Sequence, residues 1–164
     1  MNPMHITLER VCIESSKSFE AVMAGLETGI GRPDMGVLQP QLHGAATFAE
    51  FQRLINGAVG SADLMEFLRL DLGGSMKKDP EARVCKMARI IAGNPLIMKQ
   101  MVEHVPDAGS YAPVTLLVYE SHGKVHICYD MMESLLRPYG SEPALQVAKD
   151  LDAKVMKLLT EVAG

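Results

Sequence analysis

Two neighbouring stretches in the second half of the chain alternate apolar and polar residues, as half-buried β-strands do. They cover residues 114–120 and 124–130, and the pair His122-Gly123 lies near their junction. Glycine at the second position of a two-residue turn is typical of a tight hairpin. The pattern therefore predicts an antiparallel hairpin in which Tyr119 lies opposite His126.

Alternation along this hairpin divides its side chains between two faces. One face is apolar and is expected to lie in the core: Val114, Leu116, Val118, Val125, Ile127 and Tyr129. The other face is mixed: Thr115, Leu117, Tyr119, His126, Cys128 and Asp130. A sheet with one polar face presents either a solvated side or a binding side. The mixed face is thus interpreted as solvated surface, as a pocket wall or as an oligomer interface.

Helical spacing of apolar residues predicts several helices along the rest of the chain. A first helix starts after Ser15, Ser16 and Ser18 with Phe19, and a second follows the capping box that Thr47 opens. Asn94-Pro95 is typical of a helix start, and Ser141 precedes a long final amphipathic helix.

Residues 4–14 alternate as a strand, 83–92 lead into Gly93-Asn94-Pro95, and 64–72 fit either a strand or a helix. Residues 31–46 and 73–80, rich in glycine, proline or charge, are expected to be loops. Together the pattern predicts a single α+β domain over residues 1–164, with an insertion of loop and helix at about residues 31–63. Its sheet is mixed or antiparallel, with helices packed on one face as a two-layer sandwich.

Composition excludes several classes of protein. The chain has 16 basic and 20 acidic residues, a net charge of −4, and no basic stripe, which argues against a nucleic-acid partner. Its apolar runs are too short for a membrane span. Three cysteines without a CxxC spacing, and no pattern of a signal peptide, predict reduced thiols and a cytoplasmic location.

The stretch 89–130 carries a resemblance. A strand running into Gly93-Asn94-Pro95, then a helix, then Ala112-Pro113-Val114 and a hairpin ending in Tyr129-Asp130, resembles the family called domain of unknown function 302. The Ser-rich segment before Phe19 is similar to the start of that family. The resemblance implies a compact α+β sandwich, often oligomeric, and it implies no reaction.

Six residues are candidates for a binding site: Asn94, Thr115, Tyr119, His126, Cys128 and Asp130. An imidazole near Tyr119 and Cys128 could act as a general base, activate the thiol, or bind a metal or haem. The plainer interpretations are a hydrogen-bonded sheet histidine and a cysteine that packs as a small hydrophobe. The helix that Asn94 starts could hold an anion, or Asn94 could be an ordinary N-cap.

No assembled catalytic motif occurs in the sequence, so whether the protein is an enzyme stays open. The five histidines have no metal-ligand spacing, and the 12 methionines are interpreted as flexible core packing rather than as copper or haem ligands. The first hypothesis is a cytoplasmic protein, expected to be a homo-oligomer, that binds a small molecule or anion beside Asn94 and the hairpin. The alternatives are a haem, metal or redox protein or enzyme that uses His126, and an interaction subunit.

Overall fold

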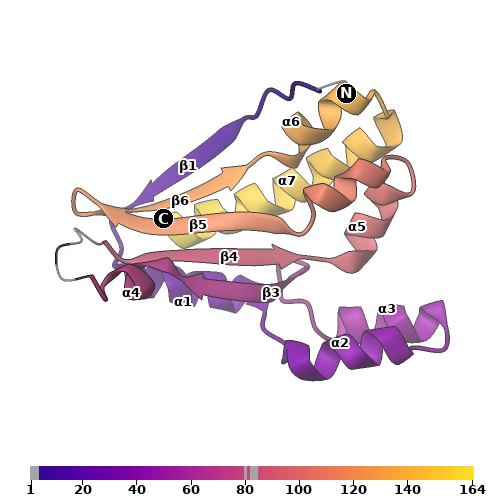
Figure 1. Cartoon of the computed structure of the whole chain (residues 1–164), viewed down its shortest axis with the longest axis horizontal. Helices are drawn as coiled ribbons and strands as arrows, with labels where there is room; N and C mark the ends of the chain where they lie inside the picture. Colours follow the sequence, from indigo (N-terminus) through magenta and orange to yellow (C-terminus); the bar gives the residue numbers. More distant parts are fainter. Residues whose placement is uncertain (1–3, 80, 82–84) are drawn as a thin grey trace.

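The protein is built around one six-stranded sheet with the strand order β1-β6-β5-β4-β3-β2 (Figure 1). The computed structural model describes residues 4–79, 81 and 85–164. All neighbouring strands are antiparallel except β2 and β3, which are parallel. The strands are β1 (Arg10–Ser15), β2 (Ile30–Gly31), β3 (Leu64–Asp71), β4 (Met87–Gly93), β5 (Val114–Ser121) and β6 (Lys124–Asp130).

Two long helices cover one face of the sheet, which confirms the α+β class with helices on one side (Figure 1). They are α1 (Phe19–Gly29) and α7 (Glu142–Ala163). Shorter elements follow the strands: α4 (Leu72–Met76), α5 (Pro95–Val102), η1 (Pro106–Ser110), α6 (Met132–Leu136) and η2 (Arg137–Tyr139). A pair of helices, α2 (Met35–Gly44) and α3 (Phe48–Asn56), projects beyond the β3 side of the sheet.

The predicted hairpin is confirmed, including its register. Tyr119 pairs with His126, and the turn residues His122 and Gly123 both have positive φ angles of 50° and 74°. Such angles are those of the tight turn that suits the twist of paired strands. The apolar face of β5 and β6 is buried, and it packs in one core with the α7 residues Ala148, Leu151, Val155, Leu158 and Leu159.

Hydrogen-bonding side chains begin several helices, as the sequence predicts. The Ser18 hydroxyl accepts a bond from the Ala21 N–H, and the Asn94 side chain accepts one from the Leu96 N–H. The Thr47 hydroxyl likewise accepts a bond from Glu50. In a capping box the Glu50 carboxylate would accept from the N–H of Thr47 itself. Here it accepts instead from the N–H of Ala46, one residue earlier.

Three segments correct the sequence interpretation. Residues 31–46 are not a loop, because Asp34 caps a helix whose Leu38 is buried, and packing outweighs the proline at position 40. The expected loop at 73–80 starts with helix α4, where Asp71 accepts a bond from the Gly74 N–H. The expected strand 4–14 begins only at Arg10. Before it, Glu9 bonds to Met131 and Ser134, outside the sheet ladder.

Candidate functional site

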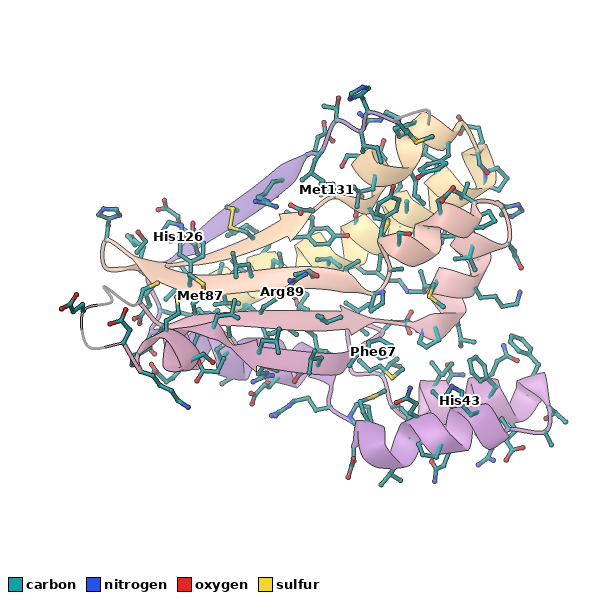
Figure 2. The ribbon with its side chains drawn as sticks, viewed as in Figure 1. His43, Phe67, Met87, Arg89, His126 and Met131 are labelled. Carbon is teal, nitrogen blue, oxygen red and sulfur yellow. A yellow bond between two sulfur atoms is a disulfide. The ribbon has the colours of Figure 1, made fainter. Side chains whose placement is uncertain are left out.

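The sheet face opposite α1 and α7 carries most of the predicted site residues. Thr115, Tyr119, His126 and Asp130 are half-buried on this face. The alternating residues of the same two strands are buried on the helix side: Val114, Leu116, Val118, Val125, Ile127 and Tyr129. Cys128 lies on the same face and is 6 % exposed. Figure 2 shows Arg89 near the middle of this face, with Met87 and His126 toward the β5–β6 turn. We call this surface the open face.

A groove of about 410 Å³ lies on the open face. Its lining residues come from β1, α4, β4, β5 and β6: Arg10, Leu72, Met87, Arg89, Thr115, Leu117, Cys128 and Asp130. Three predicted residues, Thr115, Cys128 and Asp130, therefore line one cavity.

The two arginines of the groove differ in their partners. Arg10 is bound to Asp130 through two hydrogen bonds, from Nε at 2.5 Å and from a terminal nitrogen at 2.8 Å. Arg89 belongs to none of the arginine ion pairs formed within the described part of the chain. Its only side-chain hydrogen bond there is a long one, 3.4 Å, to the Thr115 hydroxyl. The groove therefore carries one positive charge, that of Arg89, which no carboxylate of the described residues neutralises.

An aromatic pair lies beside the groove on the next row of the sheet. The Tyr119 and His126 rings are stacked, with centroids 4.9 Å apart and planes 15° apart. The cross-strand neighbours of His126 are Tyr119 on β5 and Glu14 on β1. The stack gives His126 a fixed place on the open face, as expected for side chains directly opposite each other in a ladder.

The cysteines overturn one prediction. Cys12 and Cys128 are direct partners across β1 and β6, with a Cα–Cα distance of 4.1 Å, and they form a disulfide. The expectation of three reduced thiols is therefore wrong, and so is a thiolate pair of Cys128 with His126. The sequence could not predict this bond, because the two cysteines are 116 residues apart and meet only because β1 lies beside β6 in the sheet.

Thiol titration provides a direct check of this bond. In denaturant without reductant, an aromatic disulfide reagent is expected to find one reactive thiol, that of Cys85. After dithiothreitol treatment and its removal, the same assay is expected to find all three cysteines. Three thiols in the untreated protein would contradict the disulfide.

Asn94 lies apart from the rest of the predicted site. Tyr119, the partner of His126, pairs with Met87 at the start of β4, and Asn94 follows the end of that strand. At about 3.3 Å per residue this separation is about 23 Å along the sheet. The Asn94 side chain is occupied there, since it caps α5 and donates to the backbone oxygen and the carboxylate of Asp63. The structure thus does not bring Asn94 together with His126.

A buried polar centre on the helix side was missed from sequence. Asp152 accepts hydrogen bonds from the Tyr129 hydroxyl at 2.6 Å and from the Met132 and Glu133 N–H groups at 2.8 and 2.9 Å. Burial raises the pKa of Asp152, against hydrogen bonds that lower it, and burial also raises the pKa of Tyr129. One feature of the sequence could have indicated this centre: Asp152 follows Leu151 and falls within the apolar stripe of the last helix, where a carboxylate is unusual.

Arg10, Arg89 and Cys12 were also missed as parts of the site. Their place on the open face follows from the register of the sheet, because each is paired with a residue of that face. Arg10 pairs with Asp130, Cys12 with Cys128, and Arg89 with Leu117.

In residues 4–79, 81 and 85–164, no group of three or more His, Cys, Asp or Glu side chains is arranged to hold a metal ion. Over the same residues, no helix combines the length and apolar character needed to cross a membrane.

Comparison with known proteins places the chain in a family. No curated protein matches it. A crystal structure of an uncharacterized conserved DUF302 protein from Bacillus stearothermophilus is similar in fold, with a TM-score of 0.67 at 12 % identity. The match covers 94 % of this chain and 98 % of that one. Residues 41–162 match the family described as Domain of unknown function DUF302, and the chain therefore belongs to this family.

Proposed function

We propose that the protein binds a small organic oxyanion, a carboxylate or a phosphate, in the groove of the open face. The observation that carries the proposal is the exposed guanidinium of Arg89, which lies in the groove without a carboxylate partner among the described residues. A guanidinium is planar and presents a fork of donors that fits a carboxylate or a phosphate.

The charge distribution supports an anionic ligand. Arg10 is already neutralised by Asp130, so the excess charge of the groove is the one on Arg89. The Thr115 hydroxyl beside Arg89 adds a second group that can donate to an oxyanion. The ion pair of Arg10 and Asp130 adds no net charge, so Arg89 is the group in the groove that attracts the charged end of such a ligand.

The walls of the groove indicate the rest of the ligand. Met87, Leu72 and Leu117 contribute apolar side chains around Arg89. A volume of about 410 Å³ is within the range of pockets that take small organic molecules. We therefore expect a ligand with an anionic head and a compact apolar body, and inorganic phosphate is expected to bind more weakly.

Calorimetric titration with benzoate, inorganic phosphate and neutral benzamide tests the proposal. Benzoate is expected to bind and benzamide is not, because only the carboxylate forms a charge-assisted pair with Arg89. Replacing Arg89→Ala is expected to weaken benzoate binding by about 10- to 100-fold, the size of a lost charge-assisted hydrogen bond. Arg53→Ala, which removes a highly exposed arginine of α3, serves as the matched control and is expected to bind benzoate as the wild type does.

Three results would refute this assignment. The first is that none of the oxyanions binds the wild-type protein. The second is equal affinity for benzoate and benzamide. The third is an Arg89→Ala variant that binds benzoate as tightly as the Arg53→Ala control.

The cellular location and the oligomeric state stay predictions. The cytoplasmic location was argued from reduced thiols, and the disulfide between Cys12 and Cys128 removes that support, since such bonds persist mainly in oxidising compartments. An oligomer is supported by Leu68 and Leu70, which expose 48 % and 36 % of their surface on β3. Light scattering over a range of concentrations checks the oligomer.

A further inference from the structure

We propose a second binding site, for an uncharged apolar molecule of about the size of a benzene ring, at the end of the sheet where α5 begins. A hollow of about 190 Å³ lies between the ends of β4 and β5, the start of α5 and one residue of α7. The residues of its wall that decide its chemistry are Phe67, Gly93, Asn94, Met98, Met101 and Pro113. We call it the end hollow.

The end hollow offers almost no polar group to a ligand. The one polar side chain, that of Asn94, already makes hydrogen bonds through both its oxygen and its nitrogen. Pro95 and Pro113 have no N–H to donate. Among the described residues, no buried side-chain nitrogen or oxygen lacks a partner. A charged ligand would therefore lose its hydration without compensation, whereas an apolar one would gain from leaving water.

A β-bulge directs Phe67 to this site. Glu66 pairs with Ala92 and Leu68 pairs with Ile91, so Phe67 is an additional residue on β3 without a partner on β4. Bulges redirect side chains in this way. The Phe67 ring lies next to Gly93, where a Cβ atom would be 3.6 Å from the ring and 3.1 Å from Pro113. The missing side chain of Gly93 thus leaves room for Phe67 and Pro113 to meet over the strand end.

Size and wall chemistry indicate the class of ligand. An apolar cavity of about 150 Å³ is large enough to bind benzene, so a hollow of about 190 Å³ accommodates a single small ring. Met98 and Met101 supply flexible, polarisable side chains that adapt to different shapes and contact aromatic rings favourably. The end hollow shares no lining residue with the groove around Arg89, so this site does not depend on the proposed oxyanion site.

Titration with toluene and with benzoate, followed by NMR of the methionine methyl groups, tests the inference. Toluene is expected to shift the Met98 and Met101 methyl resonances in a saturable way and to raise the melting temperature. Benzoate has the same ring with a charge, and it is expected to leave these two resonances in place. The Arg89→Ala variant is expected to respond to toluene as the wild type does, which separates this site from the groove.

A filling substitution supplies the second arm of the test. Met98 is half-buried at the hollow, so Met98→Trp is expected to occupy it and to weaken toluene binding by about tenfold or more. Met76→Trp changes an exposed methionine outside the hollow and serves as the matched control. This variant is expected to bind toluene as the wild type does. The proposal is overturned if toluene leaves the Met98 and Met101 resonances of the wild type unchanged. It is equally overturned if benzoate shifts them as much as toluene does, or if a folded Met98→Trp variant binds toluene as the control does.

Discussion

Replacing Asp152 by alanine is expected to lower the free energy of unfolding by about 3–4 kcal/mol. The carboxylate accepts bonds from the Tyr129 hydroxyl and from the first N–H groups of α6, which have no partner within their own helix. Its removal leaves three donors without an acceptor in the interior between β6, α6 and α7. Urea unfolding of the variant and the wild type measures the difference.

Two further variants make this experiment specific. Asp150→Ala removes an exposed carboxylate two residues away on the same helix, so it is expected to change stability by no more than about 0.5 kcal/mol. Asp152→Asn keeps one acceptor oxygen but turns an NH₂ group toward one of the donors. The free energy of unfolding that it loses is therefore expected to lie between the losses of Asp150→Ala and Asp152→Ala. Equal stability of Asp152→Ala and Asp150→Ala would contradict the structural role given to Asp152.

Loss of the Cys12–Cys128 disulfide is expected to lower the free energy of unfolding by about 4–5 kcal/mol. The bond joins residues that are 116 positions apart, so it removes much conformational freedom from the unfolded chain. The folded state changes little, because β1 keeps a six-residue register with β6. Urea unfolding of the oxidised protein, of the dithiothreitol-reduced protein and of the double variant Cys12→Ser/Cys128→Ser measures the effect.

Cys85→Ser is the matched control for this prediction, since Cys85 is not bonded to another cysteine. It is expected to unfold at the same urea concentration as the wild type and to keep the response to dithiothreitol. An unfolding midpoint that is the same with and without reductant would show that the bond contributes nothing to stability.

The parts of the fold that were predicted correctly are those set by local chemistry. The β5–β6 hairpin follows from alternation and from Gly123 in the turn, and the start of α5 follows from Asn94 and Pro95. Each signal lies within a few residues of the structure that it specifies. Helix α2 was missed because proline and glycine in its sequence predict a loop, while the burial of Leu38 depends on the rest of the protein.

The candidate site was predictable only in part, for the same reason. The hairpin pattern places Thr115, Cys128 and Asp130 on one face, and the groove confirms that they lie together. Arg89 and Cys12 reach the same face through the neighbours of the hairpin, β4 and β1, whose registers no local pattern gives. The sequence carries no signal for the distance between Asn94 and His126, since that distance is set by the length of β4 in the folded sheet.

The position of β1 at the sheet edge has a consequence for protein synthesis. Within the described sheet its only neighbour is β6, and β2, β3, β4 and β5 all lie between the two in the sequence. A nascent chain translated as far as residue 113 would hold β2, β3 and β4, while β1 still had no strand to pair with. β1 therefore stays unpaired until residues 124–130 have been synthesised, the state in which an associated chaperone would meet it.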